Sequence, residues 1–242
     1  MPESTSILPA DAVAAAINDG KKHLLLAATG SVATIKLPNI ISALSNHTNL
    51  SIRVILTKSA ANFLSGQAPE QPTVASLASL PHVDGIYQDE DETGTTWTRG
   101  RGILHINLRK WAHILVVAPL SANTLAKIAN GISDSLLTDL IRAWDTTGLA
   151  DGQPHKRIVV CLAMNVAMWL HPVTAKQIRV LEEEWGVQEE EDRVEKTDPL
   201  ASEGWFEVVR PIEKSLACGD VGIGGMREWT DVVKIIEQRM GL

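Results

Sequence analysis

Three side chains of this sequence could move protons or hold a carboxylate group: His105, Asn165 and Cys218. Histidine transfers protons near neutral pH. An asparagine amide can orient a carboxylate without adding charge. A cysteine among glycines could deliver a proton after a mobile segment has closed over a substrate. A lone His105 also suits a structural role, whereas a free thiol within LACGDVGIGGM (216–226) has no packing purpose.

Hydroxyl groups recur in the turns that follow three apolar segments. These turns are Thr29-Gly30-Ser31 after segment 23–28, Thr57 with Ser59 after segment 52–56, and Ser121 with Asn123 and Thr124 after segment 113–119. Ligands of open α/β sheets bind beyond the carboxyl ends of the strands, so we expect these groups to share one polar ligand. The alternative is that each hydroxyl only caps the helix that follows it, as Ser59 could cap the helix that carries Phe63.

The first turn resembles a binding site for a single phosphate. It leads into a helical pattern from Val32 to Leu44, and the backbone N–H groups at a helix start favour anions. Pro38 requires that this helix bends or starts late. The turn is neither a Walker loop nor the dinucleotide pattern G-x-G-x-x-G, so a mononucleotide fits better. With Phe63 available to stack on a planar ligand or to pack in the core, the pattern suits flavin mononucleotide (FMN).

The elements that must position these groups are organised around the stretch from Ile103 to Asp145. Its strand at 113–119 is apolar without alternation, which predicts burial on both faces of a parallel sheet. We expect Pro119 to end this strand. Further strands at 23–28, 52–56, 157–162 and 205–211 alternate with helices, including one that begins at Pro172 and one at 229–240. About five strands in this order predict a parallel α/β sandwich.

Composition excludes several classes of protein. The 242 residues are 45% hydrophobic, with a formal net charge of −7. An acidic chain of this kind does not bind nucleic acid through a general basic surface. No apolar run reaches the roughly 20 residues that span a membrane, and the N-terminus lacks a secretory pattern. Two cysteines, with Cys161 expected as a buried apolar residue, fit a reducing compartment, so we expect a cytoplasmic protein.

Four segments are expected to lie outside the regular core. Residues 1–20 are small and polar and read as a flexible N-terminal arm, which leaves 21–242 as a single domain. Residues 66–102 are loop-rich, with an acidic run at 89–92 that is expected to be solvated. The acidic segment 182–204 predicts a solvated or disordered insertion. The glycines after Cys218 exclude a strand or helix and predict a flexible flap.

Six segments carry a resemblance to a known family. They are TGSVATIK (29–36), TKSAANF (57–63), LHINLRKWAHILVVAPLSANTLAKIANGISDSLLT (104–138), IRAWD (141–145), AMNVAMW (163–169) and LACGDVGIGGM (216–226). In this order they resemble the homo-oligomeric flavin-containing cysteine decarboxylases, and most closely the eukaryotic phosphopantothenoylcysteine decarboxylases with their fungal halotolerance-type relatives. The resemblance covers most of residues 23–228.

The resemblance implies a flavodoxin-like or Rossmann-like three-layer α/β/α sandwich with a parallel sheet. It implies a homotrimer with FMN near the subunit interfaces. The reaction would be the decarboxylation of 4′-phosphopantothenoylcysteine to 4′-phosphopantetheine in coenzyme A biosynthesis. In that reaction the cysteine moiety is oxidised to a thioaldehyde, CO₂ leaves to give an enethiol, and the enethiol is then reduced. No metal site is implied.

The resemblance also assigns roles to residues. His105, Asn165 and Cys218 match catalytic positions, with Asn165 holding the substrate carboxylate and Cys218 donating the proton that completes the reduction. Substrate contacts are expected at Asn165, Met168, Ala217, Gly219 and Asp220. Flavin contacts are expected at Gly30, Ser31, Val32, Thr57, Ser59, Phe63, Ser121, Ala122, Asn123, Thr124 and Ala163.

Departures from the family pattern leave alternatives open. Leu162 stands where the family usually has proline, and the segments 146–156 and 182–204 are longer than in compact members. One alternative is an inhibitory subunit of a Ser/Thr protein phosphatase, a role that fungal relatives can take. Another is a peptidyl-cysteine decarboxylase, which stops at the enethiol, although Cys218 argues against that. A flavin prenyltransferase would leave His105 and the ACGD segment unexplained.

Overall fold

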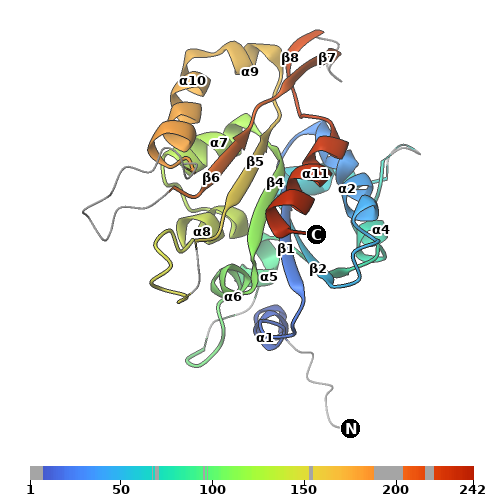
Figure 1. The fold of residues 1–242 in the computed structure, drawn as a ribbon, viewed down its shortest axis with the longest axis vertical. Helices are drawn as coiled ribbons and strands as arrows, with labels where there is room; N and C mark the ends of the chain where they lie inside the picture. The colour runs from blue at the N-terminus through green and yellow to red at the C-terminus, as the bar shows by residue number, and fades with distance from the viewer. Residues whose placement is uncertain are drawn as a thin grey trace.

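The computed structural model describes residues 8–66, 68, 71–94, 96, 98–152, 155–187, 204–215 and 221–242. Within these residues a six-stranded parallel sheet runs through the molecule, with helices on both faces (Figure 1). Its strands are β1 (Lys22–Ala28), β2 (Leu50–Leu56), β3 (Val83–Tyr87), β4 (Ile114–Leu120), β5 (Ile158–Leu162) and β6 (Phe206–Val209). The predicted three-layer α/β/α sandwich with a parallel sheet is therefore confirmed.

The central strands are buried on both faces, as their unbroken apolar sequences predict. Every residue of β2, β4 and β5 is buried. Successive side chains point to opposite faces, so Leu25 packs in one core and Leu24 and Leu26 in the other. Strand β4 continues through Pro119 to Leu120, one residue beyond the expected end.

The helices divide between these two cores. One core packs against α1 (Pro9–Ala15), α6 (Leu104–Trp111), α7 (Ala122–Ala129), α8 (Leu136–Arg142) and α10 (Pro172–Arg179). The other packs against α2 (Leu37–Ala43), α3 (Lys58–Ala61), α4 (Val74–Ala78) and α11 (Trp229–Met240). The helix expected from Val32 starts late, because a 3₁₀ turn η1 (Val32–Lys36) precedes α2 and places Pro38 in its first turn.

Three expectations for the outlying segments need correction. The loop-rich region 66–102 contains α4, the edge strand β3 and the short helix α5 (Asp89–Thr93). Residues 9–15, in the stretch expected as a flexible arm, form α1, whose Val13 is fully buried against the α6 side. Gly222, Gly224 and Gly225 lie in a strand, β8 (Val221–Gly225), which pairs antiparallel with β7 (Ile212–Ser215). Extended backbone pairing thus outweighs the low strand propensity of glycine there.

The strand order β3-β2-β1-β4-β5-β6 fixes where a ligand can bind. The connections run in opposite directions on the two sides of the β1–β4 pair. A crevice therefore opens at the carboxyl ends of these two strands, which is the usual ligand position in such a sheet.

Residues 185–187 are hydrogen-bonded to residues 205 and 206, at the start of β6. The Trp205 N–H donates to the Trp185 carbonyl (2.9 Å), and the Val187 N–H donates to the Phe206 carbonyl (2.9 Å). The indole rings of Trp185 and Trp205 stack with their centroids 5.7 Å apart. Most of the acidic stretch expected as an insertion, residues 188–203, lies outside the described residues. No helix of the described chain has both the length and the apolar character needed to cross a bilayer.

Candidate active site

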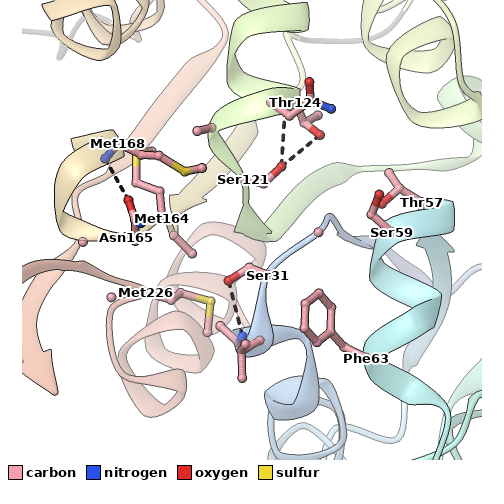
Figure 2. A pocket seen from close by; sticks show the side chains of 18 of the residues that line it. Ser31, Thr57, Ser59, Phe63, Ser121, Thr124, Met164, Asn165, Met168 and Met226 are labelled. Atoms are coloured by element: carbon pink, nitrogen blue, oxygen red, sulfur yellow. Dashed lines mark hydrogen bonds between the residues drawn. The ribbon is translucent and has the colours of Figure 1, made fainter. Parts of the chain in front are cut away.

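A cavity of about 660 Å³ lies at the carboxyl ends of β1, β2, β4 and β5 (Figure 2). Its volume is in the range of sites for small molecules and cofactors. All eleven positions expected to contact flavin line this cavity, and Asn165 and Met168 line it too. These are Gly30, Ser31, Val32, Thr57, Ser59, Phe63, Ser121, Ala122, Asn123, Thr124 and Ala163.

Four polar residues of the cavity wall are also N-caps of the elements that follow the strands. Ser31 Oγ accepts from the Ala33 N–H (3.4 Å), Thr57 Oγ1 from Ala60 (3.3 Å), Ser121 Oγ from Thr124 (3.4 Å) and Asn165 Oδ1 from Met168 (2.8 Å). Capping and lining the cavity are therefore not alternatives, because the same side chains do both. The expected cap at Ser59 is wrong: Thr57 caps α3, and Ser59 lies inside this helix facing the cavity.

The cavity has two contrasting walls. Figure 2 shows Phe63 with Ser59 on one side and Asn165 with three methionines on the other. Phe63 belongs to the 3₁₀ turn η2 (Asn62–Leu64) and is only partly buried, which leaves its ring in contact with the cavity. Aromatic and thioether groups both make favourable contacts with flat ring systems. The arrangement suits a planar ligand between the two walls.

The side-chain amide of Asn165 has N–H donors that its helix cap does not use. It caps the short helix α9 (Val166–Leu170) through its carbonyl oxygen, so the amide NH₂ is not used by the cap. An asparagine amide carries two N–H donors, and either can bond to an acceptor in the cavity. The cap fixes the side chain, and the free donors can hold an anion such as a carboxylate.

The charged residues of the cavity leave an excess of positive charge. Five basic residues line it, and three of them are paired: Lys127 with Asp134 (2.7 Å), Lys214 with Glu228 (3.1 Å) and Arg227 with Asp231 (3.9 Å). The other two are Lys36 and Lys58. Positive charge in the cavity lining favours a ligand that carries phosphate.

The hairpin β7–β8 covers one end of the cavity. The Met164 N–H donates to the Gly224 carbonyl (2.8 Å), which docks β8 on the chain that follows β5. A Cβ atom at Gly224 would lie 2.5 Å from the Met164 carbonyl oxygen, so only glycine permits this contact. Four expected site residues between the two hairpin strands lie outside the described residues: Ala217, Cys218, Gly219 and Asp220.

His105 lies outside the cavity lining. It occupies the first turn of α6, and its Nδ1 is 2.6 Å from Glu92 Oε1 on α5. The structure thus brings Asn165 to the cavity but does not bring His105 to it within one chain.

Cys161, the one cysteine among the described residues, is not suited to act as a nucleophile or a proton donor. Cys161 lies in β5 and is fully buried, and burial raises its pKa to about 12, with the nearby Glu207 carboxylate adding to the effect. A neutral buried thiol is a poor nucleophile and a poor acid. The expectation that Cys161 acts as a buried apolar residue is confirmed.

Several cavity residues were missed by sequence reasoning. Asp89 comes at the carboxyl end of β3, a strand that was not predicted, and Met226 to Trp229 join the hairpin to α11. The signal for Asp89 was its position directly after the alternating segment VDGIY, the same strand-end rule that identified Thr57. Other missed lining residues are Ala33, Ile35, Lys36, Lys58, Lys127, Asp134, Ser135, Met164, Lys214, Gly224 and Gly225.

Comparison with known proteins adds independent information. A profile of the family described as Flavoprotein matches residues 13–241. The chain is 38% identical to "Probable thymidylate synthase" of Schizosaccharomyces pombe over 93% of its length, and 39% identical to "Coenzyme A biosynthesis protein 3" of Saccharomyces cerevisiae over 92%. It spans only 30% and 34% of these two proteins. It is 36% identical to the phosphopantothenoylcysteine decarboxylase of Mus musculus, over 90% of this chain and 86% of that one.

Two solved structures are similar to this chain in both sequence and fold. One is a PPC decarboxylase mutant complexed with pantothenoylaminoethenethiol, which is 36% identical and superposes with a TM-score of 0.70 over 92% of this chain and all of that one. Another is "The FMN binding protein AtHal3", also 36% identical, with a TM-score of 0.65 over 90% of this chain and 96% of that one.

Proposed function

The chain belongs to the Flavoprotein family, and from this premise we propose that it binds FMN and decarboxylates 4′-phosphopantothenoylcysteine to 4′-phosphopantetheine in coenzyme A biosynthesis. One observation carries the proposal: the positions expected to contact flavin and the asparagine expected to hold the substrate carboxylate line a single cavity. Relatives named phosphopantothenoylcysteine decarboxylase that match most of both chains support the choice of reaction.

The cavity suits FMN by its shape and its donors. The strand-end hydroxyls and the lysines of the lining fit a phosphate and a ribityl chain, and the space between Phe63 and the methionines fits a flat ring. When bound, FMN supplies the two-electron oxidation of the cysteine moiety and the matching reduction. The protein residues then have to hold the substrate, exclude water and supply protons.

Asn165 is proposed to hold the substrate carboxylate. Its carbonyl oxygen is fixed by the Met168 N–H, so the amide donors keep one orientation toward the cavity. Neutral donors bind the carboxylate without trapping it as a stable ion pair, which leaves it free to depart as CO₂ once its electrons can be delocalised.

A second copy of the chain is proposed to supply His105. The residue lies outside the lining of its own cavity, while Asp89 on the neighbouring helix α5 does line it. In a cyclic oligomer each chain could present α6 to the cavity of the next chain. The same interface, repeated around the ring, would then supply His105 to every cavity. This arrangement agrees with the homotrimer implied by the resemblance.

Cys218 is proposed to donate the last proton. It follows β7 in the sequence and precedes β8, whose Gly224 docks beside Met164 at the cavity. Within the cysteines of this chain the donor cannot be Cys161, because that thiol is fully buried with a raised pKa.

Two measurements test the proposal. The purified protein should show the visible absorption of bound FMN, and a colourless protein that takes up no added FMN would contradict the cofactor assignment. Incubation with 4′-phosphopantothenoylcysteine should yield CO₂ and 4′-phosphopantetheine by mass analysis. Accumulation of an enethiol would instead favour an enzyme that stops at that stage, as peptidyl-cysteine decarboxylases do.

The regulatory role stays a second prediction. Its test is inhibition of a purified Ser/Thr protein phosphatase by this protein, measured beside the decarboxylation assay, because the two activities do not exclude each other.

A further inference from the structure

Glu92 and His105 form a close pair at one edge of the molecule. Glu92 Oε1 lies 2.6 Å from His105 Nδ1, and the two side chains are 18% and 22% exposed. The distance is that of a strong charge-assisted hydrogen bond rather than of a loose surface contact. The acidic run at 89–92, expected to be only solvated, therefore places one of its carboxylates against the histidine.

The element that carries Glu92 is held in place by two contacts. The Gln88 N–H donates to Asp91 Oδ2 (2.7 Å), which closes a capping box at the start of α5. Asp89 Oδ1 accepts from the Leu136 N–H at the start of α8 (2.8 Å). Because α5 is fixed to α8, the Glu92 carboxylate stays in place and can hold the His105 ring in one position.

His105 is fixed from its own side as well. It lies in the first turn of α6, between Leu104 and Leu108, which are both buried in the core. Asn107 on the same helix donates to the Ala10 carbonyl (2.9 Å) and ties α6 to α1. The imidazole therefore sits between two anchored helices, with Nδ1 engaged and Nε2 left for other partners.

A metal site is the competing explanation, because Asp139 Oδ lies within 4.8 Å of the other two ligand atoms. Two ligands about 2.1 Å from one ion in tetrahedral geometry stand about 3.4 Å apart. The Glu92–His105 distance of 2.6 Å is too short for that arrangement. Asp139 is also engaged by a hydrogen bond from the Ser133 hydroxyl.

We propose that Glu92 is a positioning residue, which holds His105 as the tautomer with the proton on Nδ1 and presents Nε2 to the substrate. A carboxylate that accepts from one ring nitrogen fixes both the tautomer and the ring orientation. The second carboxylate oxygen, Oε2, is buried and has no hydrogen-bond partner among the described residues, so Glu92 is directed to the histidine alone. The proposal rests on the proposed function, since it gives His105 the role of the reacting histidine.

The test compares Glu92→Ala, Glu92→Gln and the control Glu90→Gln. Glu90 lies on the same helix but is exposed, so its variant removes the same charge without touching His105. Glu92→Ala should lower kcat by about tenfold to a hundredfold at unchanged KM. Glu92→Gln, whose amide oxygen can still accept from Nδ1–H, should recover part of this loss. The control should match the wild type in kcat, KM and bound FMN.

A second readout separates positioning from stability. The ¹⁵N NMR signals of His105, identified by their loss in His105→Asn, should show the Nδ1–H tautomer in the wild type and a shift toward Nε2–H in Glu92→Ala. An unchanged tautomer, or a Glu92→Ala variant that loses only thermal stability or FMN while kcat per bound FMN is kept, would overturn the proposal.

The NMR result does not depend on the decarboxylation assay. If the wild type released no CO₂ from its substrate, the proposed function would fall, while the tautomer would still show whether Glu92 holds His105. Addition of Zn²⁺ to the wild type provides the last check, because tight binding that is lost in both Glu92→Ala and Asp139→Asn would replace the positioning role by a metal site.

Discussion

Asn165 shows how one side chain can serve the fold and the site together. Its side-chain oxygen accepts from the Met168 N–H at the start of α9, and the residue also lines the cavity. Aspartate is an equally good N-cap, so replacing the amide by a carboxylate removes the donors without removing the cap. The position thus permits a substitution that affects binding and leaves folding intact.

Asn165→Asp should therefore keep the FMN content and the Tm of the wild type. Its kcat/KM for 4′-phosphopantothenoylcysteine should fall on the order of a hundredfold, because a charged hydrogen bond is replaced by like-charge repulsion. Steady-state assays and thermal unfolding would measure the two effects. Unchanged KM and kcat would refute the role in carboxylate binding.

The two cysteines should differ in reactivity. A thiol with a pKa of about 12 has only about one part in ten thousand as thiolate at pH 8, and burial blocks access to Cys161 as well. Iodoacetamide at pH 8 should modify the native protein once per chain, at Cys218, and should modify Cys161 only after unfolding.

Peptide mapping by mass spectrometry would locate the label. The variant Cys218→Ser is the matched control and should take up no label in the native state. Labelling of Cys161 in the folded protein would contradict its burial.

At the scale of elements, the strand-end turns depend on close contact between neighbouring segments. Gly30, between β1 and η1, has no room for a side chain: a Cβ atom there would lie 2.8 Å from Ser59 Cβ on α3. Contacts below 3.0 Å force a shift of one segment. The shift would widen the cavity between two of the residues proposed to hold FMN.

Gly30→Ala should weaken FMN binding by about tenfold to a hundredfold, the cost of a modest steric shift. The double variant Gly30→Ala with Ser59→Gly removes the opposing Cβ and should recover part of the affinity, although glycine within α3 and the lost hydroxyl both carry a cost. Fluorescence titration of the apoprotein with FMN would measure both. Equal affinities for the single variant and the wild type would show that the contact does not shape the site.

The sequence predicted the central elements well and the edge elements poorly, for a physical reason. Strands buried on both faces, such as β4, have unbroken apolar sequences, and hydroxyl caps mark the helices that follow them. Edge strand β3 is only partly buried and β8 is mostly glycine, so neither has that pattern. Their pairing partners, β2 and β7, determine their structure, and a linear pattern does not identify such partners.

At the scale of the molecule, the residues expected to form the site do not all line the one cavity, since His105 is outside its lining. Strand-end reasoning predicted that the hydroxyl-bearing turns lie close together, and the structure places these turns and Asn165 at one cavity, because parallel strands end at one edge of the sheet. The same reasoning could not place His105, because α6 precedes its strand and lies at another edge of the molecule. Sites completed by a second chain leave no trace in the spacing of one sequence.

Mixing two strongly impaired variants tests whether the site is shared between chains. Alone, His105→Asn should be inactive and Asn165→Asp should keep about a hundredth of the wild-type kcat/KM, yet co-expression should restore about one quarter of the sites if His105 and Asn165 of a site come from different chains. Decarboxylation assays of the purified mixture, with each variant alone as the control, would measure the recovery. No recovery from mixed oligomers would mean that each chain uses its own histidine.

The contact between Trp185 and Trp205 has a consequence for how this protein could vary. The stretch between these two residues begins and ends at adjoining points of the fold, because main-chain hydrogen bonds join Trp185 to Trp205 and Val187 to Phe206. Lengthening a stretch with fixed, adjoining ends adds little entropic cost, about 0.6 kcal/mol for each doubling. The stretch can therefore be shortened, exchanged or tagged between these fixed ends, and such variants would test what it contributes to the protein.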